Sequence, residues 1–146
     1  MAAWGAFLRG HAALTRTLNA QLVAEHELTI NDYEVLLRLS RAPNGQMERV
    51  DLARSLLLTP SGITRLLDGL QAAGWVEKAS CATDARVTYA VLTETGGEKL
   101  RAAAGSHLAD VDRLFSGRFD DTELQTLADL LGRLDVESRQ ESCEPG

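Results

Sequence analysis

The sequence predicts a mostly α-helical protein with one small β-hairpin, an α+β fold class. Apolar residues recur at the three- and four-residue spacing of amphipathic helices over most of the chain. Two short runs rich in β-branched and aromatic residues, 75–79 and 86–92, follow each other across a polar loop. The 146 residues, 45% of them hydrophobic and 25% charged, fit one domain with a real core.

Two helices are predicted in the first third of the chain. Apolar and aromatic side chains recur from Trp4 to Leu22 at helical spacing and indicate one long helix. The segment TIND, and Asn31 with Glu34 three residues later, are capping signals for a second helix. The turn-forming sequence RAPNG at 41–45 ends that helix.

A short helix around 49–56 is followed by a tight turn and another helix. Thr59 is a suitable N-cap for this helix, Pro60 suits its first position, and Gly74 predicts a left-handed end. Gly62 and Gly69 lie inside it, although each costs about 1 kcal/mol relative to alanine. The two glycines lie on the same flank of the helix. This indicates that the helix backbone comes close to another group there, either a phosphate backbone or a neighbouring element.

The two strand-like runs form a hairpin around the loop SCATDA, and two more helices follow. Thr93 or Thr95 caps the first of them, and Thr95 with Glu98 matches the capping-box pattern. Asp120 with Glu123 marks the start of the last helix. The tail 138–146 is expected to be disordered.

The helix after the tight turn has two chemically different faces. On a helical wheel the apolar side chains Ile63, Leu66, Leu67 and Leu70 share one side. The opposite side carries Ser61, Thr64, Arg65 and Asp68. Two short helices joined by a tight turn are the helix-turn-helix arrangement, whose second helix enters the DNA major groove. An ordinary amphipathic core helix explains the wheel about equally well.

The adjacent hairpin favours the DNA-binding interpretation, because a hairpin beside a helix-turn-helix is the winged-helix plan. Arginine can enter the narrow minor groove, where the negative potential is enhanced. Asp84 and Arg86 stand two residues apart, on one side of an extended chain, so the carboxylate can orient the guanidinium. The alternative is a plain surface salt bridge, worth about 0–1 kcal/mol.

The segments LARSLLLTPSGITRLLDGLQAAGWVEK, DAR and VTYAVLTETG resemble the MarR family of bacterial transcriptional regulators. The resemblance extends over roughly residues 5–137. The matching positions are Ser61, Thr64, Arg65, Leu66, Asp68, Leu70, Gly74, Asp84, Arg86, Leu92, Thr93 and Gly96.

The resemblance implies one domain over 1–146, with a winged helix-turn-helix lobe at about 30–92. Helices at about 1–28 and 94–137 would form a homodimer. It further implies a regulator, usually a repressor, that binds a palindromic operator and is released by a small, often aromatic, effector. The runner-up hypothesis is a protein-interaction module that has lost specific DNA binding, which the net charge of −6 and the thin wing favour.

The resemblance also implies roles for individual residues. Ser61, Thr64 and Arg65 would contact the major groove, and Arg86, oriented by Asp84, would reach the minor groove. We expect Asp68 to pair with Arg65 or with the wing rather than to contact DNA. Ala85 stands where the family usually has a second arginine, and Gly69 where a basic residue is common, so we expect weaker phosphate contacts.

Other kinds of site are not expected. The histidines and cysteines are too scattered for a metal site, and no nucleophile motif indicates an enzyme or a cofactor. The composition predicts a cytoplasmic protein without a membrane segment. Cys81 on the wing could report oxidation, but an incidental small residue is the preferred interpretation.

Aromatic side chains near the N-terminus have two interpretations. Trp4, Phe7 and His11 share one helical face, and Tyr33 stands at the start of the second helix. These residues could edge an effector pocket. An aromatic stripe at helical spacing more often belongs to a core, here that of the dimer.

Overall fold

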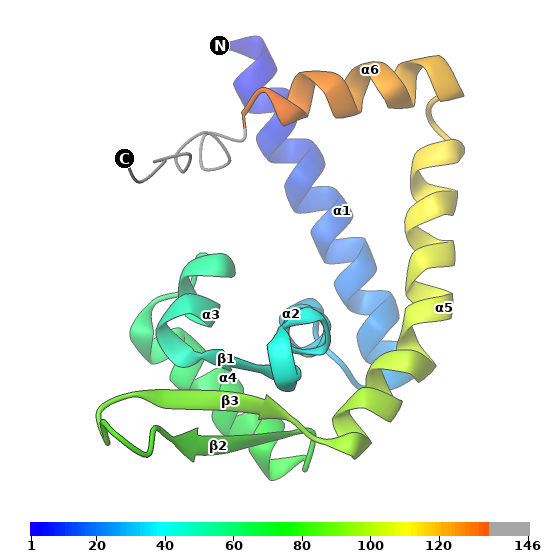
Figure 1. Ribbon diagram of the computed structural model, residues 1–146. Helices are drawn as coiled ribbons and strands as arrows, with labels where there is room; N and C mark the ends of the chain where they lie inside the picture. The colour runs from blue at the N-terminus through cyan, green and yellow to red at the C-terminus, as the bar shows by residue number, and fades with distance from the viewer. Residues whose placement is uncertain (135–146) are drawn as a thin grey trace. The chain divides into compact units, whose positions relative to one another are not determined.

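The computed structural model describes residues 1–134, so the predicted tail 138–146 lies outside the described residues. The mostly helical fold with a small antiparallel sheet is confirmed (Figure 1). The elements are α1 (Ala2–His26), α2 (Ile30–Arg41), the 3-10 turn η1 (Pro43–Gly45), β1 (Gln46–Glu48), α3 (Arg49–Ser55), α4 (Pro60–Ala72), β2 (Val76–Ser80), β3 (Thr88–Leu92), α5 (Glu94–Ser116) and α6 (Asp121–Gly132).

The sheet has three antiparallel strands in the order β1-β3-β2. The predicted hairpin forms β2 and β3, with Lys78 opposite Ala90. Strand β1, which pairs Glu48 with Tyr89, was not predicted from the sequence. Three residues are too few to show a strand period. This extra strand ties the hairpin to the start of α3.

The described chain divides into two compact units, residues 1–108 and the part from Ala109 onward. The core of the first unit is apolar and centres on the inner faces of α2, α3 and α4 together with β2, β3 and the start of α5. Its most deeply buried large side chains are Leu28, Val35, Leu36, Leu39, Leu52, Ile63, Leu67, Leu70 and Val76. Within this unit, α1 is joined to α5 through His26 Nε2, 2.6 Å from Ser106 Oγ.

The start of α2 uses one of the two capping signals that the sequence offers. The signal TIND is confirmed, because Thr29 is the N-cap, and the alternative pair of Asn31 and Glu34 is wrong. Its hydroxyl accepts a hydrogen bond from the Asp32 backbone at 3.1 Å, and the Asp32 carboxylate accepts one from the Thr29 backbone at 2.8 Å. Thr29 has the extended backbone that an N-cap requires, whereas Asn31 already lies inside the helix.

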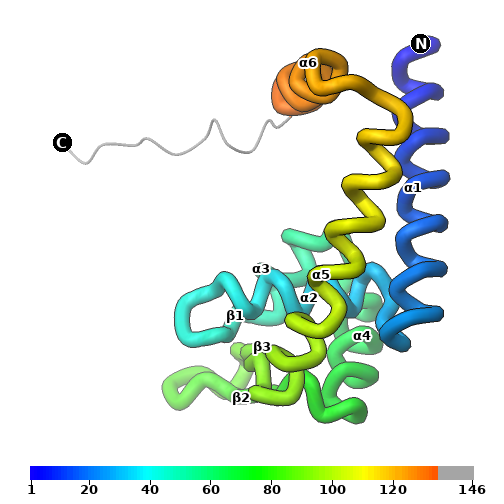
Figure 2. Tube along the Cα trace, turned by 90° about the vertical axis from the view of Figure 1, so that its right-hand side faces the viewer, coloured from blue at the N-terminus to red at the C-terminus, as the bar shows by residue number. Residues whose placement is uncertain are grey.

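The two C-terminal helices begin close to where they were predicted. Of the two candidates for α5, Thr93 is the one whose hydroxyl accepts from a helical backbone N–H, that of Gly96, at 3.0 Å. Asp120 and Glu123 form the reciprocal capping box at the start of α6, as predicted. Figure 2 shows the turn at Gly117–Asp120 that separates the two helices.

Candidate nucleic-acid interface

Helix α4 begins where the sequence predicts. Thr59 has extended backbone dihedrals (φ −71°, ψ 159°), and its hydroxyl accepts a hydrogen bond from Gly62 N at 3.1 Å. Pro60 occupies the first helical position, where no backbone N–H is needed. The cap therefore fixes the direction in which the first turn of α4 leaves the preceding loop.

The two faces of α4 separate as the wheel predicts. Ile63, Leu67 and Leu70 are buried in the core of the lobe. Ser61, Arg65 and Asp68 are exposed on the other side, and Thr64 is half-buried beside them. The polar face is therefore free to meet a partner without disturbing the core.

The glycines of α4 have different surroundings. A Cβ on Gly62 would lie 3.1 Å from Thr59 Oγ1, so the close approach there comes from the helix's own cap. A Cβ on Gly69 would meet nothing within 4 Å. Gly74 has a φ of +79° and ends α4 in the left-handed conformation that was predicted.

A hydrogen-bond chain joins α3 to the polar face of α4. The Thr64 hydroxyl donates to the Pro60 carbonyl at 2.8 Å, and Arg49 Nη1 donates to Thr64 Oγ1 at 3.3 Å. Arg49, at the first position of α3 and 15 residues before Thr64, was not predicted as a site residue. It could have been predicted from the helix-turn-helix arrangement, in which α3 packs against α4 and brings its first residues close to the polar face.

Asp68 forms an ion pair with Lys78 of β2. The expectation that Asp68 pairs inside the protein is confirmed, and its partner is on the hairpin rather than at Arg65. The pair connects the middle of α4 to the base of the wing.

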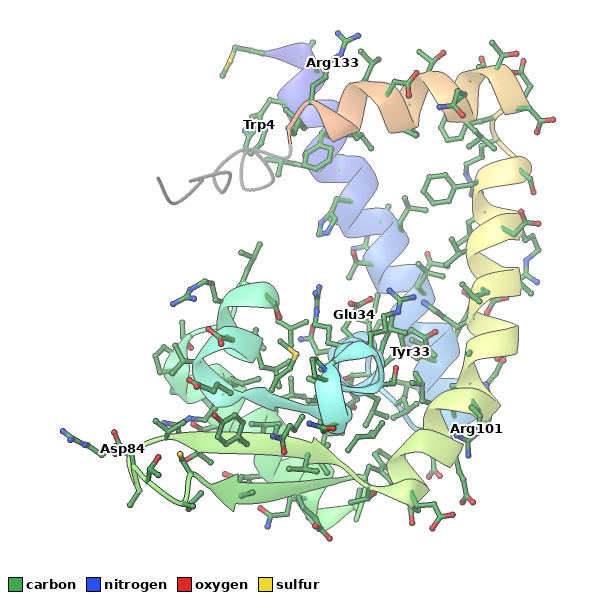
Figure 3. All side chains as sticks on the ribbon, in the orientation of Figure 1. Trp4, Tyr33, Glu34, Asp84, Arg101 and Arg133 are labelled. Carbon is green, nitrogen blue, oxygen red and sulfur yellow. The ribbon has the colours of Figure 1, made fainter. Side chains whose placement is uncertain are left out.

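The tip of the hairpin carries the predicted Asp84 and Arg86 arrangement. Asp84 Oδ1 accepts hydrogen bonds from Arg86 N at 3.0 Å and from Arg86 Nε at 3.3 Å. The Arg86 side chain is 93% exposed, so the carboxylate orients it without covering it. Figure 3 shows Asp84 at the end of the hairpin farthest from α5.

The basic groups of residues 49–92 fall into two sets. Arg54, Lys78 and Arg86 each have a carboxylate partner. In the part of the chain that the structure describes, no carboxylate lies within 4.0 Å of the Arg49 or Arg65 guanidinium. Within residues 49–92, these two arginines are therefore available to meet an external anion.

Two other titratable groups lie on the hairpin. Cys81 Sγ is 3.2 Å from Thr83 Oγ1, and hydrogen bonding from Thr83 lowers the pKa of the Cys81 thiol. The Tyr89 hydroxyl donates to Glu48 Oε1 at 3.4 Å, and the negative charge of Glu48 raises the pKa of Tyr89. Both contacts are local to the sheet.

The candidate pocket residues are not gathered at one place. Figure 3 shows Trp4 near one end of α1 and Tyr33 near the other. Tyr33 packs against His107 with ring centroids 4.5 Å apart, and burial raises the pKa of its hydroxyl. Trp4 and Phe7 stack at 6.3 Å with 59% and 41% of their surfaces exposed.

The described residues contain no group of three or more histidine, cysteine, aspartate or glutamate side chains that could hold a metal ion. Within residues 1–134, no helix has both the length and the apolar character needed to cross a membrane.

Comparison with known proteins gives one consistent family. The MarR family model matches residues 26–87. AbsC, a MarR family transcriptional regulator from Streptomyces coelicolor, is 31% identical, with 96% of this chain and 94% of that chain covered and a TM-score of 0.83. Sco3205 of the same organism, solved in complex with DNA, is 26% identical, covers 96% and 87%, and has a TM-score of 0.84. The HTH-type transcriptional regulator MhqR of Bacillus subtilis is 25% identical over 118 residues, 81% of this chain and 79% of that protein.

Proposed function

The chain belongs to the MarR family of transcriptional regulators, and from this premise we propose that it is a repressor that binds a palindromic operator as a homodimer. The family consists of regulators rather than enzymes. The two lobes of the dimer would exist at more than one distance from each other. A small-molecule effector would bind better to the form whose lobe spacing does not fit the operator, and so would release the protein from DNA. The solved complex of Sco3205 with DNA supports the choice of partner.

The observation that carries this proposal is the exposed polar face of α4 beside the oriented arginine of the wing. Arg65 can form a bidentate pair with guanine O6 and N7, and Ser61 can bond a base edge or a phosphate. Thr64 lies on the same face, where its methyl group can contact a thymine methyl. Arg86, held by Asp84, would enter the minor groove next to the site.

Exposed apolar side chains on the terminal helices support the homodimer. The exposed large apolar side chains of α1, of α5 and of residues 117–134 are Trp4, Phe7, Leu8, Val23, Leu108, Phe119, Leu130, Leu131 and Leu134. Burying such surface contributes roughly 25 cal/mol per Å². A second copy of the chain would cover these side chains, as the family resemblance predicts.

The second candidate is a winged-helix interaction module without specific DNA binding. The net charge of −6 favours it, because a negative protein is repelled from DNA at long range. Since the carboxylates of Asp51, Asp68 and Asp84 already neutralise three cations of the lobe, few basic groups remain for phosphates.

Salt-dependent binding to DNA from the protein's own promoter region separates the two candidates. A regulator that neutralises phosphates loses affinity steeply with salt, with a slope of about −0.9 per phosphate in a double-logarithmic plot. We expect specific binding in fluorescence anisotropy, with a slope of several units. Equal affinity for the promoter and a shuffled sequence, or no binding at low salt, would favour the interaction module.

A further inference from the structure

We propose that Arg49 is a DNA-contacting residue of the lobe, which binds a backbone phosphate beside α4 while the Thr64 hydroxyl holds its guanidinium in place. The inference rests on the proposed DNA-binding function and adds a contact that the sequence motif does not contain. Arg49 belongs to α3 rather than to the polar face of α4.

The Thr64 hydroxyl uses its only proton within the protein. A threonine hydroxyl has one proton to donate and two lone pairs to accept with. The proton is used on the Pro60 carbonyl at 2.8 Å, and one lone pair is used by Arg49 Nη1. The hydroxyl therefore has no proton left for a base acceptor, and one of its two lone pairs holds Arg49.

The Arg49 guanidinium, in contrast to the Thr64 hydroxyl, keeps most of its hydrogen-bond donors unused. It carries five N–H donors in a fixed fork, and its one side-chain hydrogen bond in the described chain is the bond to Thr64. No carboxylate of the described residues neutralises it within 4.0 Å. The Arg49 guanidinium is half-buried, held in place by Thr64, and without a neighbouring negative charge. Such a group is suited to bind an oxyanion, which accepts two parallel N–H hydrogen bonds.

The surroundings of Arg49 restrict its position. It lines an open hollow of about 210 Å³ between α3 and α4, together with Arg54 and the apolar residues Val50, Ala53, Leu58, Pro60 and Ile63. The apolar part of this lining and the Thr64 anchor reduce the rotamer freedom that a long basic side chain would lose on binding. An arginine restrained in this way loses less entropy on binding a phosphate than a fully exposed one.

A phosphate is a better ligand than a base for this group. In a helix-turn-helix the first helix crosses the DNA backbone, whereas the front of the second helix reaches the base edges. Arg49 starts that first helix, and Arg65 lies on the second. Arg54, Lys78 and Arg86 are each paired with a carboxylate, so Arg49 is one of the few basic groups of residues 49–92 whose charge is free for a phosphate.

The test compares Arg49→Ala with Arg54→Ala. Arg54 lines the same hollow five residues later on α3, but it is exposed and paired with Asp51, so it is a control for the unpaired charge of Arg49. Binding of the full chain is measured against salt on its promoter DNA and on shuffled DNA. We expect Arg49→Ala to weaken both about tenfold, as for one lost charge-assisted hydrogen bond, and to reduce the salt slope by about 0.9. Arg54→Ala should stay within about twofold of the parent.

Two further variants test the anchor and guard against misfolding. Arg49→Lys keeps the charge and should retain the salt slope of the parent. Thr64→Val removes the hydroxyl, and its effect should largely disappear when Arg49→Ala is already present, because both changes remove one contact. Fully additive losses would show that Thr64 acts independently and would overturn the anchor.

The outcomes distinguish this inference from the proposed function. If the parent chain binds DNA and Arg49→Ala behaves like Arg54→Ala, the Arg49 contact is wrong and the regulator stands. If Arg49→Ala relaxes sequence preference with an unchanged salt slope, Arg49 reads a base and the phosphate assignment is wrong. If the parent chain shows no salt-dependent binding, the proposed function is itself contradicted, and this inference with it.

Discussion

At the scale of single residues, the polar face of α4 has one exposed charged side chain without an ionic partner among the described residues. Arg65 is exposed, and no carboxylate of residues 1–134 lies within 4.0 Å of its guanidinium. Its neighbour Asp68 is instead paired with Lys78. Arg65 is therefore available for bidentate recognition of a guanine.

Arg65→Ala should lower the affinity for the specific site by about 1–3 kcal/mol and relax the preference at one base position. The physical reason is that alanine removes both donors of the bidentate pair but leaves the fold intact, because the side chain is exposed. Binding to a library of single-base variants of the operator measures this. Equal weakening on every sequence would show that Arg65 contacts a phosphate instead.

The residues of the site were predictable to the extent that their geometry is local. Asp84 and Arg86 meet because they are two residues apart, and the exposed face of α4 follows from helical periodicity. Arg49 was missed because its bond to Thr64 depends on how α3 packs against α4. The choice of Lys78 as the partner of Asp68 likewise depends on the tertiary fold.

At the scale of elements, the turn between α3 and α4 contains a strained leucine. Leu57 has a φ of +54° and is 92% exposed. Left-handed backbone costs a non-glycine residue about 1–2 kcal/mol, and this side chain gains little from packing. The turn is nevertheless closed by hydrogen bonds from Leu57 N to Arg54 O and from Leu58 N to Ala53 O.

Leu57→Gly should therefore raise the free energy of unfolding by about 1 kcal/mol, because glycine adopts this conformation without steric cost. Denaturant unfolding followed by circular dichroism measures the change. Leu57→Ala is the control, since it removes the exposed side chain but keeps the left-handed strain, and it should be nearly neutral. A destabilised glycine variant would show that Leu57 makes a stabilising contact.

The junction between α4, the hairpin and α5 depends on a glycine. A Cβ on Gly96 would lie 2.1 Å from the Trp75 carbonyl oxygen, which no small shift can accommodate. Thr93 fixes the same junction, since its backbone N–H donates to Trp75 O and its hydroxyl donates to Gly74 O at 2.7 Å. The match to the family pattern at Thr93 and Gly96 thus has a packing cause.

Gly96→Ala should destabilise the protein by about 1–3 kcal/mol or more, the usual range for overpacking a tight contact. Gly97→Ala is the neighbouring control, because its Cβ would approach only the end of the flexible Arg101 side chain, at 3.4 Å. Alanine should be neutral or slightly stabilising there. Thermal unfolding of both variants measures the difference, and equal melting temperatures would contradict the close approach.

Most elements were predictable from periodicity and caps, and the exceptions have physical causes. Helix α4 was placed correctly because Thr59, Pro60 and Gly74 mark its ends independently of tertiary structure. The sequence left two candidates for the cap of α2, because Thr29 and Asn31 both head plausible capping patterns, and only the structure selects Thr29. Strand β1 is defined by its pairing with β3, so the local sequence does not predict it.

At the scale of the whole molecule, the charge of the chain is unevenly distributed. The net charge is −6, yet the segment 49–92 that holds the candidate interface has five basic and four acidic residues. Long-range attraction to DNA is therefore weak, and in the proposed complex the affinity would come from short-range contacts at α4, the wing and Arg49.

Hydroxyl-radical footprinting on the neighbouring intergenic DNA tests the central claim most directly. A homodimer that places two copies of α4 in successive major grooves predicts two symmetric protected segments with centres about 34 Å apart, roughly one helical turn. Flanking minor-groove protection should weaken in Arg86→Ala. A single protected segment would contradict the dimeric arrangement, and the absence of any protection at low salt would contradict DNA binding by this lobe.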